Sequence, residues 1–154
     1  MLSLPPELAD PVEQLRATLM EVNGSERSCM TSAVASASQA KSLPEVQAIM
    51  ARCRKSAATA AATAIDTFRA ACSEAGAHTT SPAKAALHAA TATSVSDFWA
   101  TSESVAAALA AEAASQLPAQ GRDKTTQAIN NIYTDRAWSI NRYFEQLTTE
   151  QLTT

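Results

Sequence analysis

The chain has few of the residues that break helices or build sheet edges. Its 154 residues include only three glycines and six prolines, and aromatic residues make up 5%. The prolines lie in the N-terminal segment or near predicted helix ends, so little of the sequence predicts turns or strands. Leucine, isoleucine, valine and phenylalanine together fall below the roughly 20% that usually supplies a globular core, and alanine dominates instead. The composition therefore predicts long helices around a thin core.

Strong charge and long apolar runs are also missing. The formal net charge is only -3, whereas disordered chains typically combine few large apolar residues with a high net charge. A mildly acidic chain lacks the basic face that nucleic-acid binding requires. Runs without charge, such as 57–65, are too short and too rich in alanine and threonine to supply the about 20 strongly apolar residues of a membrane span. We expect neither nucleic-acid binding nor a transmembrane segment.

Cysteine is scarce, and its spacing is uneven. Cys29, Cys53 and Cys72 are odd in number and widely separated, which favours reduced thiols with packing roles over a disulfide framework. Residues 1–10 contain neither the basic region nor the apolar stretch of a secretory signal peptide. From these features we expect a cytoplasmic protein.

Short polar residues followed by proline mark three predicted helix starts, because such side chains accept from the free amide groups of a first turn. These starts are Asp10-Pro11, Ser42 ahead of Pro44-Glu45, and Ser81-Pro82. The second start has the pattern of a capping box.

Glycine marks the predicted ends. Gly76 is expected to end the second helix and leave 76–81 as a loop, and Gly121 or Asp123 is expected to cap the last helix. The sequence thus predicts a single all-α domain over 1–154, an elongated antiparallel bundle of three to four long amphipathic, alanine-rich helices. The predicted helices are 11–40, 43–75, 82–117 and 123–147, followed by a frayed tail over 148–154.

Apolar residues recur at helical spacing on the first two predicted helices. The first has a seam interrupted only at Glu26, and the second has bulky residues at both ends with alanine between them. Trp99 widens the apolar sector of the third helix, and we expect Trp138 on the fourth to pack in a broad core. The residues that we expect to contact an apolar surface or a partner are Leu15, Leu19, Val22, Val46, Ile49, Met50, Ile65 and Phe68.

Patterns that would carry catalysis or metal binding are weak. His78 and His88 do not lie in a ligand-spaced cluster, and the expected helix end at Gly76 would separate His78 from Glu74. Basic neighbours could activate Cys53, but its place on the apolar stripe favours packing. Phosphate loops and nucleophile elbows are absent. We predict no enzyme activity, no catalytic residue, no metal site and no cofactor.

The segment 15–76 resembles the phasin family, small helical proteins that coat polyhydroxyalkanoate storage granules in bacteria. The resemblance covers roughly two fifths of the chain and rests on an Ala/Ser-rich first helix, a short break and a long second helix. These parts are Ser36-Ala37-Ser38-Gln39-Ala40, then Lys41-Ser42-Leu43-Pro44-Glu45, then Val46-Gln47-Ala48-Ile49-Met50-Ala51-Arg52-Cys53.

The resemblance implies a non-enzymatic amphiphile that covers an apolar polymer granule, limits granule coalescence and forms homo-oligomers. A thin core could open at little cost and expose the apolar residues of the first two helices. The alternative is a helical bundle that binds a helical protein partner, as an adaptor, a chaperone or an effector-type domain. The sequence leaves both functions open.

Overall fold

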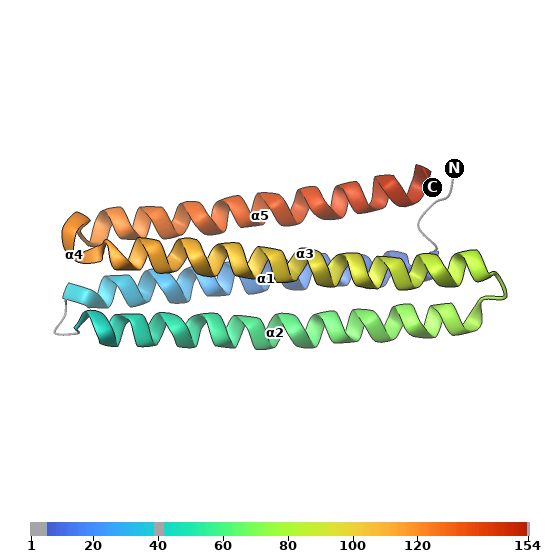
Figure 1. The fold of residues 1–154 in the computed structure, drawn as a ribbon, viewed down its shortest axis with the longest axis horizontal. Coiled ribbons are helices and arrows are strands. Elements are labelled where there is room, and N and C mark those ends of the chain that lie inside the picture. Colours follow the sequence, from blue (N-terminus) through green and yellow to red (C-terminus); the bar gives the residue numbers. More distant parts are fainter. Residues whose placement is uncertain (1–5, 39–41, 154) are drawn as a thin grey trace.

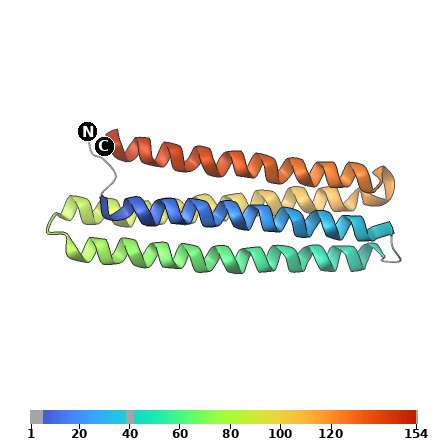
Figure 2. The same cartoon turned by 180° about the vertical axis from the view of Figure 1, so that it is seen from behind.

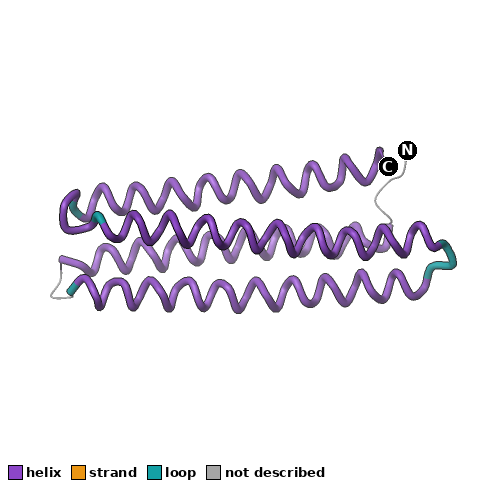
Figure 3. The backbone as a smooth tube through the Cα atoms, in the orientation of Figure 1, coloured by secondary structure: helices purple, strands orange, loops and turns teal. Residues whose placement is uncertain are grey.

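A computed structural model describes residues 6–38 and 42–153, and nearly all of them are helical. Four long helices lie along one another in an elongated bundle (Figure 1, Figure 3). Short helical segments follow the first and third of these. The elements are α1 (Pro6–Ala35), the 3-10 turn η1 (Ser36–Ser38), α2 (Leu43–His78), α3 (Pro82–Ser115), α4 (Leu117–Gln120) and α5 (Arg122–Thr153).

The four long helices run up, down, up and down. Helix α1 packs against α2 and α5, and α3 packs against the same two helices, so α1 and α3 lie on a diagonal. Seen from behind, α1 begins and α5 ends at the same end of the bundle (Figure 2). This arrangement confirms the predicted all-α antiparallel bundle.

The predicted first helix start at Asp10 is wrong, because α1 begins at Pro6 and includes Pro11. Proline in the second turn removes one amide donor, but its φ angle suits a helix. Leu8 is fully buried in the core, and this burial stabilises the additional turn ahead of Pro11. The last two residues of the predicted span 11–40 lie outside the described residues.

The predicted starts at Ser42 and Ser81 are confirmed. The Ser42 hydroxyl accepts from the Glu45 amide at 3.3 Å, and the Glu45 carboxylate accepts from the Ser42 amide at 3.3 Å, which completes the capping box. The Ser81 hydroxyl accepts from the Lys84 amide, also at 3.3 Å. Both helices therefore begin where a side chain satisfies a free backbone donor.

The predicted helix end at Gly76 is wrong, because α2 continues to His78. Gly76 does not have the positive φ that ends a helix, which among the described glycines occurs only at Gly121. Glu74 and His78 consequently share one helix face, and Oε1 of Glu74 lies 4.0 Å from Nε2 of His78 with both side chains exposed.

The C-terminal boundaries differ in two places. Helix α3 ends at Ser115, and the short α4 follows it. Helix α5 begins directly after Gly121, whose φ of 86° requires the conformational freedom of glycine. The Gly121 carbonyl accepts from the Thr125 amide in the first turn of α5. The predicted frayed tail is wrong over 148–153, because α5 continues to Thr153, and Thr154 lies outside the described residues. The segment contains no glycine or proline to end the helix.

The core consists of two groups of apolar side chains along the bundle. One group surrounds Leu19, Phe68 and Phe144, and the other surrounds Met30, Met50 and Ile129. Alanine occupies buried positions on both α2 and α3, at Ala57 and Ala61 on α2 and at Ala106 and Ala110 on α3. Each alanine buries little area, so these positions contribute less stabilisation than the buried leucines and phenylalanines.

Candidate functional site

The residues expected to contact an apolar surface lie mainly inside the bundle. Leu15, Leu19, Val22, Ile65 and Phe68 belong to the first core group, and Val46 and Met50 belong to the second. Ile49 is only partly buried and packs against the second group. The closed bundle thus covers seven of these eight side chains, and contact with a surface would require the helices to separate.

A group of buried polar residues crosses the middle of the bundle between α1 and α5. We call Asn23, Glu26, Tyr133 and Arg136 the central polar cluster; all four are buried. The Glu26 carboxylate accepts from the Tyr133 hydroxyl and, at 3.3 Å, from Nη1 of Arg136. The Asn23 amide donates to the Tyr133 backbone carbonyl at 2.9 Å. These bonds join α1 to α5 through buried polar groups that pair with one another.

Arg136 also joins the cluster to α3. Its Nε donates to the Ser102 hydroxyl at 3.0 Å, and its guanidinium carbon lies 4.2 Å from the centre of the Trp99 ring. The Trp99 indole in turn donates to Glu103. Nη2 of Arg136 has no hydrogen-bond partner among the described residues, although the side chain is buried. One donor of this buried cation is therefore left without an acceptor.

A polar pocket of about 250 Å³ opens beside this cation, between α2 and α3. Arg54 and Lys55 of α2, Trp99 and Glu103 of α3, Glu26 of α1 and Arg136 of α5 all line it. The pocket therefore contains three cationic side chains and two carboxylates. Chemically, it is suited to holding an anion.

A second cavity, which we call the α3–α5 groove, has a volume of about 320 Å³ and a largely apolar floor. Phe98, Val105, Leu109 and Ile132 line it, with Asp135 at its polar rim. Val105 and Leu109 are 52% and 44% exposed, which is unusual for large aliphatic side chains one helical turn apart. The groove is thus an apolar surface that the closed bundle leaves accessible.

The packing role predicted for Trp138 is wrong, because this side chain is 61% exposed. It lies on α5, and the Arg142 guanidinium carbon is 4.9 Å from its ring centre. Trp99, by contrast, is buried in the core. The two tryptophans therefore lie in different surroundings, Trp99 in the core and Trp138 at the solvent-exposed surface.

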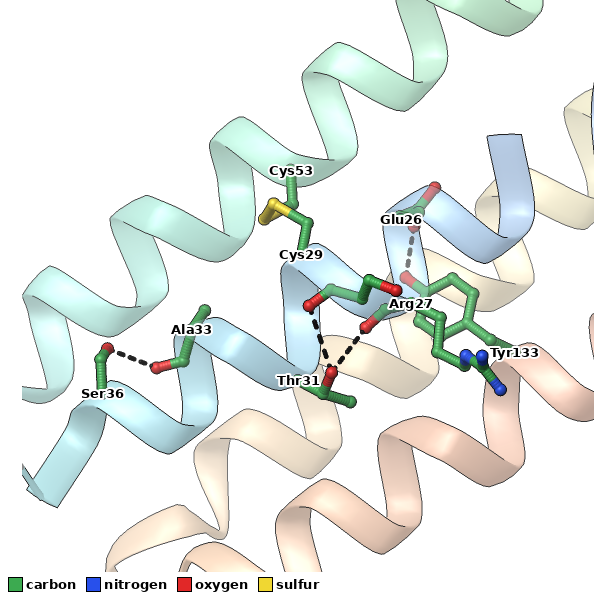
Figure 4. Close-up of a disulfide and its surroundings, with 9 residues drawn as sticks. Glu26, Arg27, Cys29, Thr31, Ala33, Ser36, Cys53 and Tyr133 are labelled. Atoms are coloured by element: carbon green, nitrogen blue, oxygen red, sulfur yellow. Dashed lines mark hydrogen bonds between the residues drawn. A yellow bond between two sulfur atoms is a disulfide. The ribbon is translucent and has the colours of Figure 1, made fainter. Parts of the chain in front are cut away.

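The prediction of three reduced cysteines is also wrong. Cys29 on α1 and Cys53 on α2 form a disulfide across the first helical hairpin, with Cα atoms 5.7 Å apart (Figure 4). The hairpin turns back between the two positions, so residues distant in sequence face each other, which spacing alone did not reveal. Cys72 is free and buried.

Burial raises the pKa of the Cys72 thiol to about 11, above its ordinary value of 9.0. Burial, and next the hydrogen bond to Glu26, raise the pKa of the Tyr133 phenol well above its ordinary value of 10.0. Both groups are neutral when protonated, so the unfolded chain loses these protons at lower pH than the folded one.

We therefore expect alkaline pH to destabilise the protein. The stability is fully present below pH 9 and falls as the pH rises from 9 to 11, with Cys72 accounting for about 2 kcal/mol. Urea unfolding followed by circular dichroism from pH 8 to 11 measures this dependence. In Cys72→Ala the decline should begin about one pH unit higher, where tyrosine ionises; an unchanged profile would contradict the assignment.

Sequence reasoning missed the central polar cluster. Its one visible sign was Glu26, the acid that interrupts the apolar seam of α1, because a carboxylate on a core face requires a partner. Tyr133 and Arg136, three residues apart on α5, share a helix face and supply that partner. Their pairing with Glu26 depends on which helices become neighbours.

Comparisons with protein-family models, with curated proteins and with solved structures find no match to this chain. Two further findings concern the part of the chain that the structure describes. Helices long and apolar enough to cross a membrane do not occur in 6–38 and 42–153. Within the same ranges, no three His, Cys, Asp or Glu residues gather in a way that could hold a metal ion.

Proposed function

We propose that this chain is a non-enzymatic helical bundle that binds an amphipathic helix of a partner protein in the α3–α5 groove. The observation that carries the proposal is the exposure of Val105 and Leu109 beside an apolar floor. Soluble bundles normally bury such residues, and an exposed apolar strip with a polar rim is typical of an interaction surface.

The shape of the groove favours a helix as its occupant. Val105 and Leu109 are four residues apart and form one ridge along α3, and Ile132 of α5 lies across the groove from them. Ridges of this kind pack into the grooves of another helix, which would present its own apolar residues at three- and four-residue spacing.

Charge indicates the chemistry of the partner helix. Asp135 lies on the groove rim, and Arg136, the cation that also lines the groove, is already paired with Glu26. A helix with basic residues beside its apolar stripe would complement this side of the bundle. Such complementarity mainly determines the choice of partner and the rate of association.

A photoreactive residue at Leu109 tests the proposal in the source cells. We expect it to form an adduct with one distinct protein, whereas the same residue at exposed Ala62 on α2 should not. Adding Val105→Asp should abolish the adduct and change the free energy of unfolding by less than about 0.5 kcal/mol, because the side chain is exposed. Equal labelling from Leu109 and Ala62 would contradict the proposal. An adduct with a second copy of this chain would also contradict a foreign partner, because it would show that the groove joins two copies in a homo-oligomer.

The second candidate is phasin-like coating of an apolar polymer granule. The buried alanines of α2 and α3 favour it, because separating small side chains loses little apolar burial. The α1–α2 hairpin would remain joined by its disulfide and would expose the eight apolar residues of its inner face. The central polar cluster opposes this opening, since separation breaks its buried hydrogen bonds.

The disulfide also bears on location. Disulfides persist in oxidising compartments, so the Cys29–Cys53 bond favours such a setting over the cytoplasmic one expected from the sequence. Alkylation of the native protein at the moment of lysis, followed by mass spectrometry, distinguishes the two settings. In an oxidising compartment only Cys72 should be labelled after unfolding.

A further inference from the structure

We propose that the polar pocket between α2 and α3 binds a small organic carboxylate with an apolar body. This site shares only Arg136 with the α3–α5 groove and does not depend on the proposed function. The pocket combines cationic side chains without partners and a buried guanidinium donor without an acceptor.

The cations of the pocket are incompletely compensated. Glu26 is already bonded to Tyr133 and Arg136, and Glu103 already accepts from the Trp99 indole. Arg54 and Lys55 have no ion-pair partner within the described residues. Three cations against two carboxylates leave a surplus of one positive charge, which one monoanion would neutralise.

Arg136 determines where the anion would bind. The side chain is only 5% exposed, and Nη2 lacks a partner although the atom is inaccessible to solvent. A buried donor without an acceptor is costly. A turn of the guanidinium toward the pocket would bring Nη2 to a carboxylate oxygen and form a charge-assisted hydrogen bond. The second oxygen would then face Arg54 and Lys55 at the α2 side of the pocket.

The remaining walls favour an apolar body over a fully hydrated ion. Ala57, Ala58 and Ala107 line the pocket together with the Trp99 ring. These surfaces provide no hydrogen bonds to a dianion such as phosphate, whereas they can cover a hydrocarbon group. At about 250 Å³, the pocket is smaller than the roughly 300 to 1,000 Å³ of sites for drug-sized ligands, so the ligand is small.

Sodium benzoate is a suitable probe, and the two tryptophans supply the measurement. Trp99 lines the pocket, whereas Trp138 lies exposed on α5. In nitrogen-15 NMR spectra at constant ionic strength, we expect benzoate to shift the Trp99 indole resonance saturably and to leave that of Trp138 unchanged. Neutral benzamide and inorganic phosphate should leave both resonances unchanged.

Arg54→Gln is expected to weaken benzoate binding by about tenfold or more, because it removes a charged donor. Arg52→Gln, an exposed position of the same helix outside the pocket, is the matched control and should bind as the original chain does. Circular dichroism checks that both variants remain folded. The proposal is overturned if benzoate produces no saturable shift, if benzamide or phosphate binds equally well, or if the two variants behave alike.

Discussion

Replacing Arg136 with methionine is expected to lower the free energy of unfolding by about 3 kcal/mol. The change removes the cation that pairs with Glu26, so a carboxylate remains in the interior with Tyr133 as its only donor. Breaking a buried ion pair on one side typically costs about 3 to 5 kcal/mol, because the remaining charge is uncompensated. Methionine retains an apolar side chain against Trp99, which limits the loss of packing. Urea unfolding at pH 7 measures the effect.

A double-mutant cycle separates the ion pair from general packing. Glu26→Gln alone leaves Arg136 buried without its carboxylate, and should also destabilise the protein. Combining Glu26→Gln with Arg136→Met removes both charges and keeps an acceptor for the Tyr133 hydroxyl. We expect the double variant to be no less stable than either single variant. Strictly additive losses would show that Glu26 and Arg136 do not interact.

Loss of the disulfide is expected to have an effect of similar size. Cys29→Ser opens a link between positions 24 residues apart, and chain-entropy arguments for a loop of this length give about 3 kcal/mol. The thermal midpoint should fall accordingly, and the α1–α2 end nearest the loop should lose protection first. Differential scanning calorimetry with and without reductant measures the change.

The same experiment contains its control. Reductant should lower the stability of the original chain to that of Cys29→Ser and should leave the variant unaffected, because Cys72 is free in both. If the original chain unfolds identically in oxidising and reducing buffer, the bond between Cys29 and Cys53 does not stabilise the bundle.

Local features of the sequence were sufficient to predict the helices and two of their starts. Ser42 and Ser81 each satisfy a backbone donor within four residues, so their roles can be read without knowing the tertiary structure. The start at Asp10 failed because burial of Leu8 outweighed the preference of proline for a first turn. The end at Gly76 failed because this glycine does not adopt the positive φ of a helix end, which among the described glycines only Gly121 has.

The candidate sites depend on contacts between helices, and the sequence revealed them poorly. Apolar periodicity correctly marked helix faces such as Leu15 to Val22. It could not distinguish a face that packs against a neighbouring helix from one that binds a ligand or an apolar surface. The disulfide and the Glu26–Arg136 pair join positions that become neighbours only after the helices have packed. The prediction for Trp138 failed in the other direction: the sequence predicted a buried side chain, but this aromatic residue remains at the surface of the bundle.

The most direct measurement is hydrogen exchange of the disulfide-intact protein with and without polyhydroxyalkanoate particles, read by mass spectrometry. If the closed bundle is the working form, amides across 15–22 and 46–68 should remain equally protected, because their side chains stay in the core. Adsorption to the particles with loss of protection in both segments would contradict this account and support granule coating by an opened bundle.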